Sequence, residues 1–127
     1  MIVRDAMTSR LVTVRATDSA LGGLKLLVQE GISGAPVVSK DSQLVGVMTE
    51  FDLLLAIDCV GEEVPISRVM TENVTSVQSD TPLENARKLM LTNNWRRLPV
   101  VDNDKLVGIL ARRDILRARF GLERPAE

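Results

Sequence analysis

Apolar and polar positions along the chain repeat one series of patterns twice. Each half opens with a short extended run and an amphipathic helix; in the second half this helix carries Ala86, Leu89 and Met90 at three- and four-residue spacing. Two β-rich runs joined by a short polar turn follow, which favours a hairpin, and a second helix closes the half. The extended runs are residues 11–14 and 74–77, the hairpins pair 35–39 with 44–48 and 98–102 with 106–110, and the closing helices begin at Glu50 and Arg112. The pattern predicts a β-α-β-β-α order in each half, and therefore an α+β fold.

The start of the second half's amphipathic helix has a signal of its own. Thr81-Pro82-Leu83-Glu84 places a hydroxyl residue, a proline and a glutamate in the order of a capping box, with proline at the first helical position. The helix is therefore predicted to begin at Pro82, with Thr81 as its cap.

The two halves are copies of one another. Pro36-Val-Val returns as Pro99-Val-Val, and the run from Leu44 to Leu54 returns from Leu106 to Leu116. We divide the chain into repeat 1 (residues 1–60), a linker (61–65) and repeat 2 (66–127). A unit of this size buries little surface alone, so the two copies are expected to pack together.

Composition narrows the function classes. The chain has 127 residues, of which 45% are hydrophobic and 26% charged, as in ordinary globular domains. It contains no histidine and one cysteine, Cys59, so it cannot assemble a Ser-His or Cys-His pair or a thiolate metal cluster. No run approaches the roughly 18 apolar residues of a membrane span, and the first residues lack the apolar core of a signal peptide. We expect a cytoplasmic protein that is not an enzyme, has no metal site and requires no cofactor.

The net charge of −1 hides an asymmetry. Residues 1–63 carry five basic and nine acidic groups, whereas residues 64–127 carry eleven basic and eight acidic ones. The arginines of the second half include Arg96, Arg97, Arg112, Arg113, Arg117 and Arg119. A single arginine is usually part of a solvated surface, but two Arg-Arg pairs at loop-like positions suit an anion. Nucleic acid is disfavoured as a partner because aromatic residues are scarce and no basic stripe is evident.

The repeated motifs resemble a tandem pair of cystathionine-β-synthase (CBS) domains over nearly the whole chain. The resemblance rests on two Met-Thr openings (residues 5–8 and 68–71), both Pro-Val-Val strands, and two Val-Gly strands that each run into a helix bearing an Asp. It implies two repeats packed with pseudo-two-fold symmetry and two clefts between them. Many members bind AMP, ADP, ATP or S-adenosylmethionine in these clefts, and the modules commonly form flat dimers.

The segment from Gly46 to Asp52 fits the family's ribose-phosphate motif. A helix N-terminus with unpaired N–H groups suits a phosphate, the Thr49 hydroxyl can donate to it, and the Asp52 carboxylate can accept from two ribose hydroxyls. The alternative is structural, because Thr49 and Asp52 also form a Thr-x-x-Asp cap. The second copy has Ala111 and Asp114 instead. A cap without its hydroxyl would lose its purpose, whereas ribose recognition would not, so this comparison favours the nucleotide role.

The resemblance also implies how each cleft is composed. Each joins the Asp motif of one copy to the first strand and pre-proline loop of the other. Cleft one then contains Thr49, Asp52, Val74, Thr75, Arg96, Arg97, Leu98 and Pro99. Cleft two contains Leu11, Val12, Ser33, Gly34, Ala35, Pro36, Ala111 and Asp114. The apolar members would enclose adenine, and the two guanidiniums of cleft one would bind phosphate.

Other residues near the motifs have simpler interpretations. The aromatic Trp95 precedes the Arg-Arg pair and is interpreted as apolar packing. Cys59, near the end of a helical run, is interpreted as a small packed or partly exposed residue. The direction of Arg112 and Arg113, the nearest cations to cleft two, is not given by the sequence.

These observations lead to one functional hypothesis and one alternative. The hypothesis is a non-catalytic sensor that binds adenosine-containing ligands, forms a homodimer and regulates a separate protein. The alternative is a ligand-independent dimeric scaffold. The dimer is predicted because the closing helices carry more apolar residues than a thin core can cover, namely Phe51, Leu54, Leu55, Ile115, Leu116 and Phe120.

Overall fold

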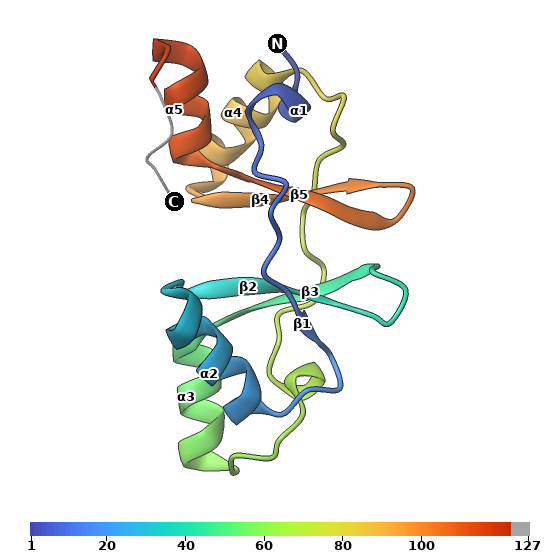
Figure 1. The fold of residues 1–127 in the computed structure, drawn as a ribbon, viewed down its shortest axis with the longest axis vertical. Helices are drawn as coiled ribbons and strands as arrows, with labels where there is room; N and C mark the ends of the chain where they lie inside the picture. Colours follow the sequence, from blue (N-terminus) through green and yellow to red (C-terminus); the bar gives the residue numbers. More distant parts are fainter. Residues whose placement is uncertain (123–127) are drawn as a thin grey trace. The chain divides into compact units, whose positions relative to one another are not determined.

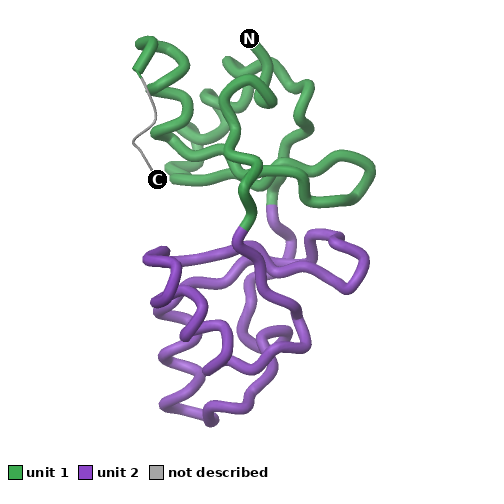
Figure 2. Tube along the Cα trace, viewed as in Figure 1, with its two compact units in different colours: residues 1–11, 75–127 green, residues 12–74 purple. Residues whose placement is uncertain are grey.

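The computed structural model describes residues 1–122 as two compact units (Figure 2). Unit 2 is residues 12–74, and unit 1 combines residues 1–11 with the chain from residue 75 onward. This grouping differs from the predicted repeats, because the N-terminal residues belong with the second copy. The predicted linker, residues 61–65, lies within unit 2, where Val64 is buried and its carbonyl accepts from Ala20 N at 2.8 Å.

Unit 2 is a three-stranded sheet with two helices (Figure 1). Its elements are β1 (Val14–Arg15), α2 (Ala20–Glu30), β2 (Gly34–Val38), β3 (Leu44–Thr49), α3 (Glu50–Cys59) and the 3-10 turn η1 (Ile66–Arg68). The strand order is β1-β2-β3, with β1 parallel to β2 and β2 antiparallel to β3. The core lies between the sheet and the helices, and its fully buried side chains include Leu27, Val37, Met48, Leu53 and Ile66.

Unit 1 repeats this plan with a smaller sheet. Its elements are α1 (Val3–Ala6), α4 (Leu83–Asn93), β4 (Arg97–Asp102), β5 (Lys105–Ala111) and α5 (Arg112–Phe120). β4 and β5 are antiparallel, and the expected first strand of the second copy is reduced to one parallel bridge between Val77 and Val100. The core side chains include Val3, Met90, Leu98, Val100 and Leu110.

The Met-Thr openings explain why the units exchange their first residues. In unit 1, Thr8 and Ile109 exchange two backbone hydrogen bonds of 2.9 Å each, so the N-terminal opening pairs with β5. In unit 2, Thr71 pairs in the same way with Val47 of β3, at 2.8 and 3.0 Å. Each opening therefore covers the outer edge of the other copy's hairpin.

The hairpins and closing helices confirm the β-β-α order predicted for the later part of each half. Both turns contain non-glycine residues with positive φ, Ser42 in the first and Asn103 and Asp104 in the second, as tight hairpins require. α3 and α5 begin at Glu50 and Arg112, as predicted.

The predicted capping box at α4 is wrong. The helix begins at Leu83, and its cap residue, Pro82, makes no side-chain cap bond. Thr81 therefore lies one position too far from the helix, and its hydroxyl accepts from Gln78 N at 3.2 Å within the preceding turn. The first copy has a working cap at the equivalent place, because the Ser19 side chain accepts from Gly22 N at 3.0 Å.

Candidate functional site

The N-terminus of α3 closes on itself through Thr49 and Asp52. The Thr49 hydroxyl accepts from Asp52 N at 3.2 Å, and Asp52 Oδ2 accepts from Thr49 N at 3.3 Å, which completes a capping box. The first helical N–H, that of Glu50, donates to the Ser33 carbonyl at 2.8 Å. Thr49 and Asp52 therefore do form the Thr-x-x-Asp helix cap that was the alternative interpretation of this motif. It leaves Asp52 Oδ1 without a hydrogen-bond partner among residues 1–122, on a half-buried side chain.

The N-terminus of α5 is held by the carboxylate alone. Asp114 is 3% exposed, and its Oδ2 accepts from Ala111 N at 2.8 Å. Its Oδ1 accepts at 3.5 Å from both the Thr8 hydroxyl and Arg117 Nη1. Both oxygens are thus engaged within unit 1, and the N-terminal opening supplies one of the donors.

This geometry corrects one step of the sequence argument. The loss of a hydroxyl at Ala111 was expected to remove the structural purpose of Asp114. The carboxylate instead caps the Ala111 N–H directly and joins α5 to the N-terminal segment. The persistence of Asp114 in the second copy therefore gives no preference to ribose recognition over capping.

The structure brings the pre-proline residues to the helix start of their own copy. Gly34 pairs with Thr49 in the β2–β3 register, next to the bond between Ser33 and Glu50. In unit 1, Arg97 pairs with Ala111, and the Arg96 carbonyl accepts from Arg112 N at 3.1 Å.

The other predicted contacts run along the same hairpins. Ala35, Pro36, Leu98 and Pro99 follow in β2 and β4 and are buried. The chain passes between the units at residues 11–12 and 74–75, so Val12 and Val74 belong to unit 2, and Leu11 and Thr75 to unit 1. Both predicted clefts draw on residues of the two units, and their composition stays a prediction.

Arg112 holds the loop before β4. Its Nε donates to the Trp95 carbonyl at 2.8 Å, and its Nη2 donates to Asn94 Oδ1 at 2.8 Å. The Trp95 side chain packs against the core of unit 1, which confirms its interpretation as an apolar packing residue. Arg96, Arg97 and Arg113 are exposed. Among residues 1–122, the side chains of these three arginines near the α5 N-terminus form no hydrogen bond or ion pair, whereas Arg112 is already engaged.

Each Met-Thr opening also packs over a Val-Gly strand. A Cβ added at Gly46 would lie 2.7 Å from Met70 Sδ, and one at Gly108 would lie 2.6 Å from Met7 Sδ. The glycines therefore leave room for the crossing segment. The signal was visible as two Met-Thr and two Val-Gly pairs, but sequence alone did not show that they meet.

The remaining features of residues 1–122 that bear on function are metal-binding groups, membrane-spanning helices and the single cysteine. No group of three His, Cys, Asp or Glu side chains in residues 1–122 could hold a metal ion. None of the helices among these residues is long and apolar enough to cross a membrane. Cys59 is free and exposed at the end of α3, which agrees with its interpretation as a partly exposed residue.

Known proteins share the sequence and the fold. The chain is 32% identical to the chloroplastic CBS domain-containing protein CBSX2 of Arabidopsis thaliana over 158 aligned positions, covering 98% of this chain and 66% of that protein. It is 34% identical to the CBS domain-containing protein YhcV of Bacillus subtilis (strain 168), covering 89% of this chain and 81% of that one. The chain thus spans slightly less than two thirds of the Arabidopsis relative.

Two solved structures extend the comparison to bound molecules. CBSX2 in complex with AMP matches with a TM-score of 0.84 at 36% identity, covering 97% of this chain and 98% of that one. The CBS domain pair of protein MJ0100, in complex with 5-methylthioadenosine and S-adenosyl-L-methionine, matches with a TM-score of 0.80 at 28% identity over 97% and 98% of the two chains. The CBS domain model itself matches residues 3–59 and 66–121, and the chain therefore belongs to the CBS domain family as a tandem pair.

Proposed function

We propose that this chain is a non-catalytic regulatory module that binds adenosine-containing ligands. The observation that carries the proposal is the duplicated strand-to-helix junction, which places an aspartate at the start of both α3 and α5. Relatives of the same fold support it, because CBSX2 was solved with AMP, and the MJ0100 pair with 5-methylthioadenosine and S-adenosyl-L-methionine. ADP and ATP share the same nucleoside and are candidates on that ground.

The two helix starts suit different parts of such a ligand. At α3, Asp52 Oδ1 is free to accept from ribose hydroxyls while Oδ2 keeps the cap. At α5 the carboxylate is fully engaged, but Ala111 offers no hydroxyl to the helix N–H groups, and Arg97 stands beside it on β4. Unpaired N–H groups and a guanidinium favour an anion. We assign the ribose preference to Asp52 and the phosphate preference to the α5 end.

The remaining predicted contacts complete the proposal. The two cleft compositions given by the family resemblance are retained as candidate ligand contacts, and the hairpin register adds the grouping of Arg96 and Arg97 with Ala111. Their apolar members would enclose adenine. We further infer that the module works as a homodimer on a separate target protein. We place it in the cytoplasm, since its single cysteine forms no disulfide.

Ribose recognition is tested by calorimetry with AMP and 2′-deoxy-AMP. A charge-assisted hydrogen bond contributes about 1.5–3 kcal/mol, so Asp52→Asn is expected to weaken AMP binding by roughly 10- to 150-fold. The matched control is Asp58→Asn, which removes the same charge from an exposed position near the other end of α3. Equal affinity of the wild-type protein for AMP and 2′-deoxy-AMP would show that Asp52 has no ribose role.

The complete capping box at Thr49 and Asp52 favours a second candidate, a dimeric scaffold that needs no ligand. Both side chains of the motif already cap the helix, each by accepting one backbone N–H. Native mass spectrometry of the purified protein separates the two functions, because it reports bound nucleotide and oligomer mass together. A dimer that neither copurifies with nor takes up an adenosine ligand would establish the scaffold.

A further inference from the structure

The segment between α4 and β4 in unit 1 is held by a residue of α5. Arg112, the first residue of that helix, is half-buried. Its Nε donates to the Trp95 carbonyl and its Nη2 donates to Asn94 Oδ1, both at 2.8 Å. Its backbone N–H donates to the Arg96 carbonyl at 3.1 Å. Three consecutive residues are thus bound to one arginine, and we call these three hydrogen bonds the Arg112 clamp.

The same segment is also fixed to the end of α4. Asn94 ends the helix with a positive φ of 55°, and its N–H donates to the Leu91 carbonyl at 3.3 Å. The next N–H, that of Trp95, donates to the Met90 carbonyl at 3.0 Å, and the Trp95 side chain packs against the core. The segment is therefore held from two helices, and it leads directly into Arg97, the first residue of β4.

α5 gives the clamp a fixed base. Ile115 was predicted to exceed what the core of its unit could cover, but it is 7% exposed and belongs to that core. Only Leu116 and Phe120, of the three apolar α5 residues named in that prediction, are exposed, at 49% and 62%. The neighbouring Asp114 is also buried and caps the helix. The helix start that carries Arg112 is therefore anchored in the unit.

Unit 2, all of whose residues the structure describes, has no counterpart of the side-chain part of this clamp. The repeat aligns Arg112 with Glu50 and Asn94 with Gly31. The backbone contacts are the same, because Glu50 N donates to the Ser33 carbonyl at 2.8 Å and Gly31 also has a positive φ. The Glu50 side chain is exposed and forms no hydrogen bond among residues 1–122. The side-chain bonds therefore belong to the copy that carries the arginine pair.

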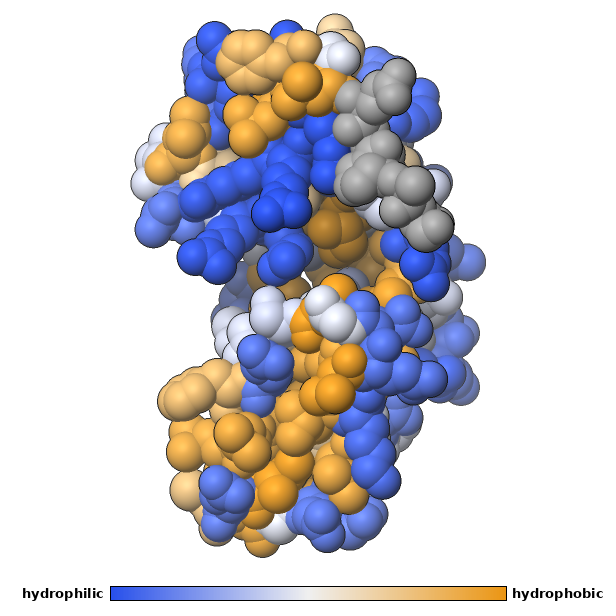
Figure 3. Space-filling view, turned by 60° about the vertical axis from the view of Figure 1, so that its left-hand side comes forward, coloured by the Kyte–Doolittle hydropathy of each residue, from blue (hydrophilic) through white to orange (hydrophobic). Residues whose placement is uncertain are grey.

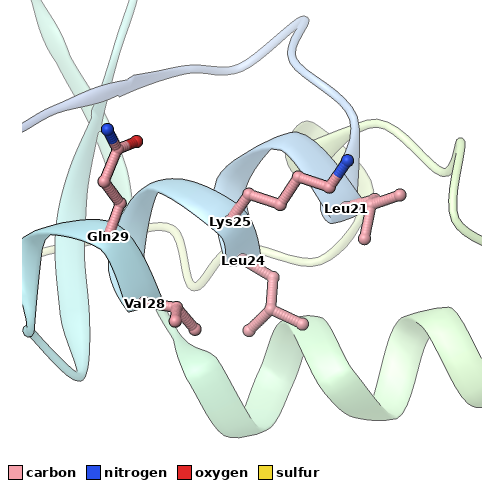
Figure 4. A pocket seen from close by; sticks show the side chains of 5 residues that line it. All are labelled: Leu21, Leu24, Lys25, Val28 and Gln29. Atoms are coloured by element: carbon pink, nitrogen blue, oxygen red, sulfur yellow. The ribbon is translucent and has the colours of Figure 1, made fainter.

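The surfaces of the two units differ in the same sense. Figure 3 shows a broad hydrophilic area on unit 1 and apolar surface gathered over unit 2. At the α5 start, Arg96, Arg97 and Arg113 are exposed. The shallow groove of unit 2 in Figure 4 is formed by α2 alone, and one of its lining residues is a cation. These residues are Leu21, Leu24, Lys25, Val28 and Gln29. An anion therefore meets more cations at the α5 start than in this groove.

We propose that Arg112 is a positioning residue for phosphate binding, because it fixes the backbone that carries Arg96 and Arg97 and does not itself bind the ligand. The inference rests on the proposed function and names the residue that prepares the α5 end for a phosphate chain. Two nitrogens of the Arg112 guanidinium are already bound to the segment. A ligand that meets an ordered backbone does not have to order it, so more of the contact energy is retained as affinity.

The clamp is expected to act on the phosphate chain and not on the nucleoside. Arg97 pairs with Ala111 at the helix start, so a change in the segment moves the Arg97 guanidinium relative to the first N–H groups of α5. Arginine binds phosphate through directed, often bidentate, hydrogen bonds, which depend on its orientation. Adenosine has no phosphate and loses no contact when this cation moves. Loss of the clamp should therefore lower the preference for ATP over adenosine.

Three variants separate the clamp from the charge of Arg112. Arg112→Met removes the guanidinium, and Arg112→Lys keeps the charge but not the planar group that reaches two acceptors. Asn94→Gly removes one acceptor and leaves Arg112 intact. Glycine suits the positive φ at this position, as Gly31 does in unit 2. The control is Arg119→Met, which removes one positive charge from an exposed position in the last turn of α5.

Calorimetric titration of the full chain with ATP, adenosine and inorganic tripolyphosphate measures the effect. Arg112→Met is expected to weaken the binding of ATP and tripolyphosphate roughly tenfold and Asn94→Gly roughly threefold, with adenosine binding changed by less than about twofold. Arg112→Lys should bind ATP nearly as weakly as Arg112→Met, and Arg119→Met should bind it nearly as the wild type does. Circular dichroism checks folding, and Asn94→Gly keeps the test decisive if Arg112→Met does not fold.

Hydrogen exchange without ligand tests the clamp itself. The amides of residues 94–97 should exchange faster in Arg112→Met and Asn94→Gly than in the wild type, because these variants lose side-chain bonds that hold the segment. Unchanged exchange in both variants would overturn the proposal.

Two binding results would also overturn it. If Arg112→Met lowers the unfolding free energy but keeps the wild-type ratio of ATP to adenosine affinity, the clamp is only structural. If Arg112→Lys binds ATP as tightly as the wild type and Asn94→Gly has no effect, Arg112 acts through its charge.

Failure of this proposal is distinguishable from failure of the proposed function. A protein that binds tripolyphosphate through the clamp but binds no adenosine compound keeps the positioning role and loses the proposed function. A protein that binds ATP equally in all the variants does the reverse. A wild-type protein that binds neither ATP nor tripolyphosphate overturns both.

Discussion

At the scale of single residues, the aspartates at the starts of α3 and α5 differ in their hydrogen-bond partners. Asp52 shares the cap of α3 with Thr49 and keeps one oxygen without a hydrogen-bond partner within residues 1–122. Asp114 caps α5 without a hydroxyl partner and also binds Thr8 and Arg117. A ligand that approaches Asp114 must compete with donors already in place, whereas one that approaches Asp52 Oδ1 need not. The same motif aspartate therefore has one oxygen without a hydrogen-bond partner in α3 and both oxygens engaged in α5.

A second residue-scale feature is the network around Ser79 in unit 1. Ser79 is 3% exposed and donates to both oxygens of Asp102, from its N–H at 3.0 Å and from its hydroxyl at 2.6 Å. Arg4 Nη2 donates to the Ser79 hydroxyl at 3.0 Å, which ties the N-terminal segment to the end of β4. The first copy has Ala16 and Ser39 at the equivalent positions, so it lacks this network.

The Ser79 network predicts an acid-sensitive stability of unit 1. The hydroxyl and then the N–H of Ser79 lower the pKa of Asp102, and the more distant Arg4 charge adds to them. A carboxyl whose pKa is lower in the folded state contributes stability above its unfolded pKa and loses it as the pH falls through the folded value. Urea unfolding should therefore show a loss of stability below about pH 4 that is smaller in Asp102→Asn.

The control for this prediction is Glu84→Gln. The pKa of Glu84 is also lowered, first by its hydrogen bond from Arg87, but this pair is exposed on α4. Its effect should be small and should vanish in high salt, because exposed ion pairs are screened. If the unfolding free energy of Asp102→Asn falls as steeply at acid pH as that of the wild type, the network does not govern the acid stability.

At the scale of elements, the crossing of each Met-Thr opening over a Val-Gly strand organises the unit. The strand glycine leaves room for a methionine, and the threonine next to it exchanges two backbone hydrogen bonds with the residue beside that glycine. The segment acts as an added edge strand. It satisfies the outer hydrogen-bonding edge of the hairpin that would otherwise be unpaired.

This crossing predicts a coupled effect of Gly46 and Met70. Gly46→Ala would place its Cβ 2.7 Å from Met70 Sδ and 2.9 Å from the Thr71 carbonyl. Overpacking of this kind costs about 1–3 kcal/mol of unfolding free energy. In the double variant Gly46→Ala/Met70→Ala the shorter side chain should recover part of that cost, so that the two losses are not additive. Urea unfolding of the two single variants and the double variant measures the coupling, and additive losses would contradict the contact.

Elements could be predicted from the sequence where the signal was local. The hairpins at Pro36 and Pro99 and the starts of α3 and α5 followed from β-rich runs, polar turns and the Asp motif, and the structure has them. α1 and η1 were missed because four and three residues give too little periodicity. The cap at Thr81 failed because the helix starts one residue later than the proline suggested.

The arrangement of the candidate site needed contacts that no local pattern shows. Arg97 beside Ala111 follows from strand register, which sequence distance does not reveal. Thr8 on Asp114 joins residues 106 positions apart. The motif and the family resemblance therefore supply candidate residues for the site, which stay a prediction, whereas the partners of these residues depend on how the hairpins and openings pair.

At the scale of the whole molecule, charge is divided between the two units more sharply than between the two repeats. Residues 12–74 carry four basic and nine acidic side chains, and the rest of the chain carries twelve basic and eight acidic ones. The exchange of the N-terminal opening contributes to this, because it moves Arg4 and Arg10 to the basic unit. An anionic ligand therefore meets opposite surroundings at α3 and at α5.

This division predicts two unequal nucleotide sites. Binding at the α5 end should strengthen from AMP to ATP and weaken as salt rises, because Arg96, Arg97 and Arg113 are exposed cations near that helix start. Binding at the α3 end should depend little on phosphate number or salt. Calorimetric titration with AMP and ATP at low and high salt should resolve two salt slopes, and a single common slope for two equivalent sites would contradict the inequality.

The variant Arg97→Ala tests whether Arg97 binds phosphate at the α5 end, with Asp114 of its own copy, or at the α3 end, with Asp52 of the other copy. It should remove much of the preference for ATP over AMP while leaving adenosine binding nearly intact, and Arg68→Ala, which removes an exposed arginine from unit 2, serves as its control. The register of Arg97 with Ala111 predicts that the loss persists in an Asp52→Asn background and disappears in an Asp114→Asn background. The cleft composition implied by the family resemblance, which joins Arg97 to Thr49 and Asp52, predicts the reverse. The two backgrounds thus decide whether the ligand site of Arg97 lies within one copy or is shared by both. If Arg97→Ala leaves the ATP preference unchanged in both backgrounds, this arginine does not bind phosphate.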